Sequence, residues 1–325
     1  MKRQFIWVIL ASFLLLTAGC GTPAQPPATP APPKIDTVKI SYVKLPLNVP
    51  SIVEKKLELF EKEFAKDNMK VAFPEITEGP AMTAALASGS LHFCNALGGT
   101  SAILAAANGL DIKIIGVYSR APEAFTIITK KADIKTAADL KGKTVAGPKG
   151  TILHQLLLSA LNRENLKADD VKFVNMTIPQ ALAALNSGDA DAALIAGPVV
   201  PKALEAGGRV LTTGKGLLDA IIVIAADGKF LAEQPTIADR YMQVHRQSLA
   251  YMKDHRDEVY RMAAEETGLS PEAVKAMYGW YDFNPTITEN DIRDLEKTQD
   301  FLLQNGLLTQ KVELKKIIKD LSVAK

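Results

Sequence analysis

Short apolar runs alternate with stretches of helical apolar spacing along the chain from Thr37 onward. The runs are rich in β-branched residues and only a few residues long, which is typical of strands. The first half therefore predicts strands 38–43, 71–76, 92–96 and 112–117, with helices from Ser51, from Pro80 to Ser88 and from Thr100 to Gly109. Ser51 and Glu54 have the spacing of a capping box, which predicts that the first helix begins at Ser51.

The second half of the chain repeats this alternation. Strands are expected at 125–129, 144–145, 171–174, 192–195, 210–212 and 221–226, and helical segments at 136–140, 179–186 and 199–206. From Ile237 to the end, the pattern predicts only helices. This order predicts an α/β fold in which mostly parallel sheets are flanked by helices, with added C-terminal helices.

The segment 143–160 shows the alternation most clearly. Its short strand runs into Gly-Pro-Lys-Gly, and helical spacing follows from Ile152. Thr151 is a good N-cap for that helix. The N-terminus of a helix presents free N–H groups and a partial positive charge, so the loop is a candidate anion site. We expect an anionic head group to accept hydrogen bonds from Gly150 and Thr151, with Gly99 and Thr100 completing the shell.

An internal repeat relates the two halves. The pattern Pro-x3-Ala-Ala-Leu-x-Ser-Gly occurs at residues 80–89 and again at 179–188, an offset of 99 residues. Gly98 then maps onto Gly197 at the same offset. Each copy reads as helix, Ser-Gly turn, strand and glycine loop, so the sequence predicts two similar α/β lobes.

Two such lobes would face each other across a cleft. In open α/β sheets, ligands bind beyond the carboxyl ends of the strands. The loops expected there are 44–48, 78–80, 98–100 and 118–120 from lobe one, and 148–151, 176–177 and 197–198 from lobe two. Arg120 and Lys149 are the charges nearest the predicted mouth and could pair with an anionic ligand or be solvated surface charges.

The N-terminal residues predict export and a lipid anchor. Residues 1–19 read as a signal peptide, with Lys2 and Arg3 before an apolar run that is too short to span a bilayer. Small residues precede Cys20, which predicts lipidation of this cysteine; an ordinary signal peptide is the alternative. Residues 20–34 follow as a proline-rich tether. Cys94 is the only other cysteine and is expected to be a buried apolar side chain.

Composition excludes few classes of protein but speaks against nucleic-acid binding. The 325 residues are 47% hydrophobic and 23% charged, as in an ordinary globular protein of two lobes or domains. Without Lys2 and Arg3, the 38 basic residues become 36, which equals the 36 acidic ones. No net attraction to nucleic acid or to an anionic surface follows.

The order of several motifs resembles a known family. They are Ala-Ala-Leu-Ala-Ser-Gly-Ser-Leu-His-Phe at 84–93, Asp-Leu-Lys-Gly-Lys at 139–143, Lys-Gly-Thr at 149–151, residues 183–192, and Asp-Phe-Leu-Leu-Gln-Asn-Gly-Leu at 300–307. In this order and spacing, the chain from Val38 to about Leu308 resembles the solute-binding lipoproteins of ABC importers for aliphatic sulfonates, taurine or nitrate.

This resemblance implies a two-lobed type II periplasmic-binding-protein fold with two crossovers, near 120–123 and 216–220. Lobe one would comprise 35–120 and 219–325, and lobe two 121–218. The implied ligand-binding residues are Leu47, Asn48, Gly79, Gly98, Gly99, Thr100, Arg120, Lys149, Gly150, Thr151 and Gly197. Sulfonate binders often carry aromatic residues where this chain has the small apolar segment 193–198, so the ligand stays open between sulfonate, taurine, nitrate and other small polar solutes.

The resemblance implies a monomer that performs no chemistry, needs no cofactor or metal, and hands its solute to a membrane permease. It would be lipid-anchored on the extracytoplasmic face of the cell membrane. A ligand-sensing lipoprotein is one alternative. An enzyme on the same fold is another, although the relative that makes the thiamine pyrimidine carries a cysteine-rich run that this chain lacks.

Other catalytic and metal motifs are incomplete. Gly142-Lys143-Thr144 imitates a P-loop, but Ala137 stands where that motif needs glycine, and no Gly-x-Ser-x-Gly is present. The four histidines are scattered, which does not favour a zinc site. His154 reads as a partly exposed helical residue, and the aromatic cluster at 278–283 as packing on lobe one, with lining of the cleft as the alternative.

Overall fold

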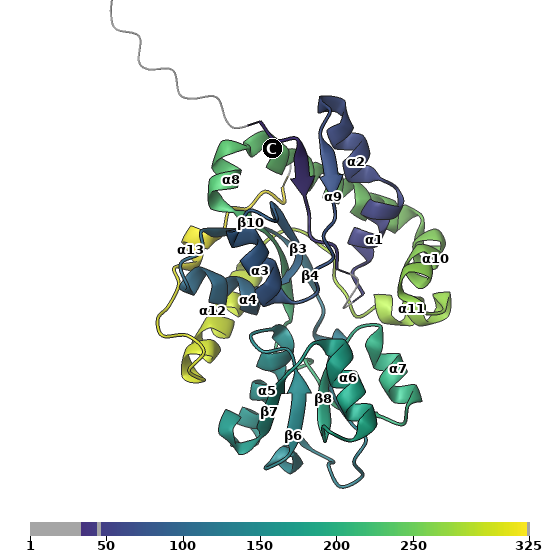
Figure 1. Ribbon diagram of the computed structural model, residues 1–325, viewed down its shortest axis with the longest axis vertical. Helices are drawn as coiled ribbons and strands as arrows, with labels where there is room; N and C mark the ends of the chain where they lie inside the picture. Colours follow the sequence, from purple (N-terminus) through teal and green to yellow (C-terminus); the bar gives the residue numbers. More distant parts are fainter. Residues whose placement is uncertain (1–33, 44–46, 324–325) are drawn as a thin grey trace, which may run out of the picture. The chain divides into compact units, whose positions relative to one another are not determined.

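The strands of this protein form two β-sheets, one in each half of the fold. The computed structural model describes residues 34–43 and 47–323 (Figure 1). Their strands are β1 (Thr37–Lys39), β2 (Lys70–Ala72), β3 (Phe93–Gly98), β4 (Ile112–Arg120), β5 (Phe125–Thr129), β6 (Thr144–Gly147), β7 (Lys172–Asn175), β8 (Ala192–Ala196), β9 (Arg209–Thr213) and β10 (Ile221–Asp227).

Both sheets have the same strand order. In the five-stranded sheet, β7-β6-β8-β5-β9, β6 is parallel to β7 and β8 whereas β5 is antiparallel to its neighbours. In the other, β10 is antiparallel to β3 and β4, β1 and β2 form a parallel pair, and a parallel bridge between Ile40 and Phe93 joins β1 to β3. The order β2-β1-β3-β10-β4 thus matches the order of the second sheet. In each sheet the antiparallel strand is the first strand after the chain has passed over from the other sheet: β5 follows β4, and β10 follows β9.

The internal repeat is visible in the elements. Gly79 begins α3 and Ile178 begins α6, while Phe93 begins β3 and Ala192 begins β8, an offset of 99 residues in both cases. Gly89 and Gly188 end the paired helices with φ of 71° and 87°, which glycine adopts without strain. The sequence prediction of two similar halves is confirmed by this correspondence.

Helices cover both faces of each sheet. They are α1 (Val49–Lys56), α2 (Leu59–Phe64), α3 (Gly79–Ala87), α4 (Gly99–Ala107), α5 (Ile152–Arg163), α6 (Ile178–Ser187), α7 (Val199–Glu205), α8 (Gly228–Glu233), α9 (Pro235–Asp254), α10 (Arg256–Thr267), α11 (Pro271–Tyr278), α12 (Glu289–Gln304) and α13 (Leu314–Ile317). Short 3₁₀ helices are η1 (Ala65–Asp67), η2 (Pro122–Ala124), η3 (Ala137–Leu140) and η4 (Ala168–Asp170). In Figure 1, α1, α2, α9 and α10 gather on one side of the first sheet and α3, α4 and α12 on the other.

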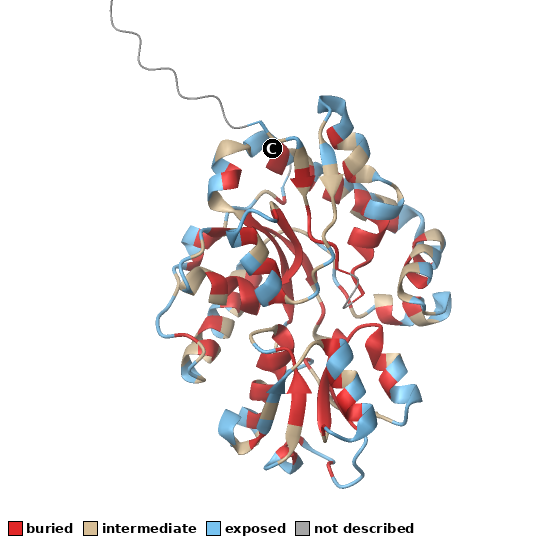
Figure 2. Ribbon diagram, viewed as in Figure 1, coloured by how far each residue is buried: buried red, intermediate tan, exposed pale blue. Residues whose placement is uncertain are grey.

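The buried side chains follow the strands and the inner faces of these helices (Figure 2). Phe93 of β3 stacks on Tyr241 of α9 with ring centroids 4.2 Å apart, which attaches the long C-terminal helix to the sheet. Cys94 is buried beside it, as the sequence predicted, and burial raises the pKa of its thiol to about 12.

The first helix differs from its prediction. It begins at Val49 with Asn48 as N-cap, and Glu58, at φ 53°, separates α1 from α2. The capping box predicted for Ser51 and Glu54 is wrong, because tertiary partners take both side chains. Ser51 Oγ lies 2.8 Å from the Tyr118 hydroxyl, and Glu54 Oε1 lies 2.7 Å from Nδ1 of the buried His245.

Two further local predictions are corrected. Thr100 does not cap α4, because Gly98 is the N-cap and Thr100 Oγ1 instead donates to Gln155 Oε1 of α5 at 2.6 Å. The C-terminal part is not wholly helical, since residues 279–288 form no helix and Asp282 bridges to Arg120 at the end of β4. That pairing gives the segment backbone partners that a helix would otherwise supply.

Some expectations lie outside the described residues. These are the signal peptide, Cys20, the tether up to Pro33, and the part of the first cleft loop formed by residues 44–46. Among the helices in the described ranges, none combines the length and apolarity that a membrane crossing needs. The lobe boundaries at 120/121 and 218/219 stay a prediction; β4 ends at Arg120 and β10 begins at Ile221.

Candidate ligand-binding cleft

A narrow cavity of about 60 Å³ lies where loops of the two sheets meet. It is lined by Thr77, Glu78, Gly79, Met82, Ala96, Gly98, Ser101, Phe125, Pro148, Thr151, Ile152, Leu153, Ile178 and Ile222. Many of these residues follow the carboxyl ends of strands β3 and β6 or begin the helix after a strand. This is the place at which open α/β sheets bind ligands, and the lining supplies hydroxyls and backbone groups within an apolar wall.

Four helices begin at this cavity. Gly79 is the first residue of α3, Gly98 is the N-cap of α4, Thr151 is the N-cap of α5, and Ile178 is the first residue of α6. Each helix N-terminus carries unsatisfied N–H groups and about half a positive charge. Four of them around one small cavity make a site that favours a negatively charged group.

The two lobes touch beside the cavity. Ser101 Oγ of α4 donates to the carbonyl oxygen of Gly150 at 2.9 Å. Gly79 lies so close to Ser101 that a Cβ on it would come within 2.2 Å of Ser101 Oγ. Glycine is therefore required at position 79 for this close approach.

Glu78 is the only lining residue, among those described, with an ionisable side chain. It occupies the N-cap position of α3, but its side chain makes no capping hydrogen bond. Its Oε1 atom is buried without a hydrogen-bond partner in the described part of the chain. Burial raises the pKa of this carboxyl, against the opposing effect of hydrogen bonding with the backbone of Ile178 and the side chain of Thr77.

Three of the predicted ligand residues line the cavity: Gly79, Gly98 and Thr151. Thr151 is the N-cap of α5, as predicted. Its hydroxyl donates to the carbonyl of Pro148 (2.8 Å) and accepts from the N–H of His154 (3.4 Å). The Thr151 hydroxyl proton is thus already engaged, and its contribution to a ligand would come from the backbone.

Lys149 and Gly150 lie beside the cavity. The Lys149 side chain is exposed, and its backbone N–H donates to Asn175 Oδ1 at 2.8 Å. Gly150 has φ of 71° and faces lobe one, where a Cβ would lie 3.5 Å from Leu104 and 3.8 Å from Pro80. Its N–H donates to His154 Nδ1 of the same lobe at 3.4 Å, whereas its carbonyl accepts from Ser101 of lobe one.

Gly99 and Thr100 line a second, larger cavity of about 350 Å³. Its other walls come from α5, α12 and the crossover Gly216–Ile221, including Gln155, Asp219 and Asp294. This cavity is larger than the first one, but the strand ends and the four helix N-termini meet at the smaller cavity.

Leu47, Asn48 and Gly197 line neither cavity. Leu47 is fully buried, and Asn48 Nδ2 donates to the carbonyl of Val43 at 3.0 Å. The N–H of Gly197 donates to the carbonyl of Ala124 at 3.0 Å, in the turn that follows β8. Each is held by protein contacts at the base of a cleft loop.

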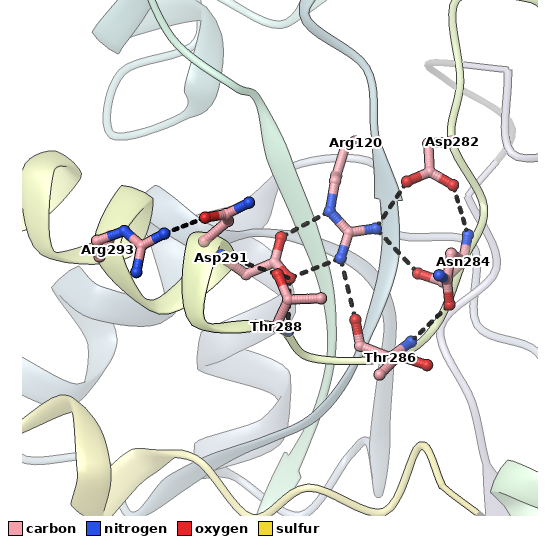
Figure 3. Close-up of polar contacts among 8 residues, drawn as sticks. Arg120, Asp282, Asn284, Thr286, Thr288, Asp291 and Arg293 are labelled. Carbon is pink, nitrogen blue, oxygen red and sulfur yellow. Dashed lines mark hydrogen bonds and ion pairs between the residues drawn. The ribbon is translucent and has the colours of Figure 1, made fainter.

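Arg120 has a different environment from the one expected (Figure 3). Its Nε and Nη2 donate to the two carboxylate oxygens of Asp291, both at 2.6 Å, and Nη1 donates to Asp282 at 3.0 Å. The carbonyls of Asn284 and Thr286 each accept a further bond at 3.0 Å. All five N–H donors of the guanidinium are therefore used by the protein, and none remains for a ligand.

His154 is buried, and the expectation of partial exposure is wrong. It is 6% exposed, and its ring lies 4.7 Å from that of Phe173. Burial, together with the charge of Lys149, lowers its pKa to about 4, so the imidazole is neutral at physiological pH. The residue packs the first turn of α5 and does not line the cavity.

Sequence reasoning missed Ser101, Met82 and Phe125 as lining residues. The glycines and the N-cap threonine are visible in sequence because turns and caps have strong local signals. Ser101 has no such signal, and only the packing of α3 against α4 brings it to the cavity.

Comparison with known proteins agrees with this architecture. The profile of the family described as NMT1/THI5 like matches residues 62–259. The chain belongs to the NMT1/THI5-like family. It is 30% identical over 290 residues to an Escherichia coli (strain K12) protein whose name assigns it to aliphatic sulfonates, covering 87% of this chain and 88% of that protein.

Two other proteins are also similar. The taurine-binding periplasmic protein of Escherichia coli (strain K12) is 33% identical over 153 residues, about 47% of each chain. The alkanesulfonate-binding protein SsuA from Xanthomonas axonopodis pv. citri, bound to MOPS, superposes with a TM-score of 0.80 at 25% identity, covering 89% of this chain and 99% of that one. The family resemblance and the two-lobed periplasmic-binding-protein fold predicted from sequence are confirmed.

Proposed function

We propose that this protein is the substrate-binding component of an ABC importer, which captures a small sulfonate in the cleft and delivers it to a membrane permease. The observation that carries the proposal is the meeting of four helix N-termini, two from each lobe, at one cavity. Such a cavity favours an anionic head group that both lobes contact. Relatives named for sulfonate and taurine binding support this ligand class.

The same geometry supports capture by closure. The α3 and α4 ends belong to lobe one and the α5 and α6 ends to lobe two, so a bound anion would be shared between them. Separation of the lobes would leave each pair of helix ends solvated. A ligand that contacts both pairs therefore favours the closed arrangement.

Simple capture without chemistry is part of the proposal. Among the described residues that line the cavity there is no cysteine, histidine, lysine or arginine. Ser101 and Thr151 supply hydroxyls, but both hydroxyls donate to backbone carbonyls. We infer an extracytoplasmic location, as for the periplasmic relative, with Cys20 as the lipid anchor.

Calorimetric titration of the purified full-length chain with ethanesulfonate, taurine, nitrate and acetate tests the proposal. We expect a sulfonate to bind most tightly and to raise the melting temperature, because a ligand that binds only the native state stabilises it. Nuclear magnetic resonance of the mixture should recover the sulfonate unchanged. Failure of every sulfonate to bind at millimolar concentration would overturn the proposed ligand class, and turnover of a bound one would overturn the role as a binding protein.

A further inference from the structure

We propose that Gln155, with Thr100 and Thr298, forms a latch between the two lobes that sets how long a captured solute is retained. The inference rests on the capture by closure proposed above and adds to it a positioning residue that does not line the smaller cavity. Its basis is one side-chain amide of α5 that bonds to two helices of lobe one.

The carboxamide of Gln155 joins the lobes through both of its polar atoms. Its Oε1 accepts from Thr100 Oγ1 of α4 at 2.6 Å, and its Nε2 donates to Thr298 Oγ1 of α12 at 3.2 Å. Gln155 is 7% exposed and Thr100 is 2% exposed. A buried amide or hydroxyl without a partner is costly, so these groups favour the arrangement in which they meet.

A second contact shows that α5 and α12 run side by side. Asn162 Nδ2, about two turns beyond Gln155 on α5, donates to Asn305 Oδ1 at the C-cap of α12, at 3.4 Å. This pair and the pair of Gln155 with Thr298 have the same sequence offset of 143 residues. An equal offset at both places means that the two helices are parallel and in register. Separation of the lobes would therefore break both contacts together.

The two threonines of the latch stand on helices that are fixed to each other. Gly99, at the start of α4, lies so close to α12 that a Cβ on it would come within 2.7 Å of the Leu295 side chain. The ion pair of Arg120 with Asp291 ties the N-terminus of α12 to the end of β4. Lobe one thus presents both hydroxyls to Gln155 as one rigid surface.

The latch acts on closure and not on recognition of the solute. When the lobes separate, water can hydrate the amide and both hydroxyls, so loss of the amide disfavours the closed arrangement alone. The apparent dissociation constant varies inversely with the population of the binding-competent state. Removal of the latch should therefore weaken the binding of every solute by the same factor.

Gln155→Leu tests the latch, because leucine is a good helix former of similar size that makes neither hydrogen bond. Gln299→Leu is the matched control. Gln299 is a buried glutamine of α12, 4% exposed, whose Oε1 accepts from the N–H of Val312 at 2.6 Å and not from lobe two. Affinities and dissociation rates for ethanesulfonate and taurine are measured on the full-length chain by calorimetry and stopped-flow mixing.

We expect Gln155→Leu to bind both ligands about tenfold more weakly, by the same factor and through faster dissociation. Thr298→Val removes only the hydroxyl on α12 and should weaken binding by about threefold. Gln299→Leu should lose stability and keep the wild-type affinities. Solution X-ray scattering without ligand should give a larger radius of gyration for Gln155→Leu than for the wild type or Gln299→Leu.

Wild-type affinity in folded Gln155→Leu overturns the inference and leaves the proposed function standing. So does a loss that differs between ethanesulfonate and taurine, because Gln155 would then contact the solute. If Gln155→Leu does not fold, wild-type affinity in Thr298→Val overturns the latch instead. If neither sulfonate binds the wild type, the proposed function fails, and the ligand-free radius of gyration decides on the latch: equal values for the wild type and Gln155→Leu overturn it.

Discussion

Arg120 and Asp291 form a two-point ion pair, in which Nε and Nη2 of the guanidinium each lie 2.6 Å from one oxygen of the carboxylate. Asp291 also accepts the backbone N–H and the hydroxyl of Thr288, at 2.7 and 2.6 Å, and so closes the capping box of α12. The pair therefore ties the N-terminus of α12 to the end of β4, where the chain leaves the first sheet. Burial would raise the pKa of Asp291, but bonds from Arg120 and Thr288 outweigh it and lower that pKa.

Replacement of Arg120 should affect stability rather than ligand binding. Arg120→Met leaves the carboxylate of Asp291, whose side chain is 3% exposed, without its cation. We expect a loss of about 3 kcal/mol in the free energy of unfolding, measured by urea denaturation. Arg163→Met is the control, because its contact with Glu164 is long and exposed, and should cost about 0.5 kcal/mol or less. A large loss of sulfonate affinity in folded Arg120→Met would restore Arg120 to the ligand site.

A side chain at position 150 should hold the lobes apart. Gly150→Leu adds backbone strain at φ 71° and directs atoms toward Leu104 and Pro80 of lobe one. We expect weaker ligand binding and, by solution X-ray scattering, a radius of gyration that no longer decreases when ligand is added. Gly188→Leu is a matched control, because its φ is 87° and nothing lies within 4 Å of a Cβ there. It should lose similar stability and still close. If ligand closes both variants, or closes neither, the claim that a side chain at position 150 holds the lobes apart would be wrong.

Thr151→Val separates the capping role of this residue from a binding role. The hydroxyl donates to Pro148 and accepts from His154, so its removal should cost about 1 kcal/mol of stability. Because the hydroxyl proton is already used, we expect the affinity for a sulfonate to change by less than about threefold. Melting temperature and calorimetric affinity are measured on the same sample. A loss of ten- to a hundredfold in affinity would show that the hydroxyl reorients to the ligand.

Burial of His154 should make stability depend on pH. Its folded pKa is about 4 against an ordinary value of 6.5, so the unfolded chain binds the extra proton first as the pH falls. Stability is therefore full above about pH 6.5 and declines between there and about pH 4, by about 2 kcal/mol at pH 5 for this residue alone. Urea denaturation at pH 7.5 and pH 5 should show a smaller decline for His154→Gln than for the wild type.

The partly buried His92 contributes in the same direction, because burial, followed by the charge of Lys39, lowers its pKa to about 4 as well. The double variant with His92→Gln should therefore lose still more of the decline. An equal decline of the free energy of unfolding between pH 7.5 and pH 5 in the wild type and in both variants would show that these imidazoles do not cause the loss of stability in acid.

Lipidation of Cys20 is tested by fractionation. Cys20→Ser should release the protein from membranes and leave sulfonate binding intact, because the described fold begins beyond the tether. Cys94→Ser serves as the control for loss of a cysteine; it removes a buried thiol and should leave the protein on the membrane. Equal membrane retention of the Cys20 variant and the wild type would contradict the anchor.

The sequence alone determined the features that depend on neighbouring residues. The alternation of strand and helix, the repeat at an offset of 99, the N-cap at Thr151 and the buried Cys94 all follow from periodicity, caps and apolar context. These signals survive without the fold because they act over a few residues. The family resemblance came from the same kind of local motif, kept in order along the chain.

Only the tertiary structure decided which side chains are free to meet a ligand. Arg120 looked available in sequence, but its partner Asp291 lies 171 residues away and takes up the guanidinium. Ser51 and Glu54 looked like a capping box, but they bond to Tyr118 and His245, which lie 67 and 191 residues away in the sequence. Glu78 shows the converse: nothing nearby in sequence marks it as unpaired, and the fold leaves its Oε1 without a donor in the described chain. A polar group bonds to whatever the fold brings within about 3 Å, and sequence distance does not limit that choice.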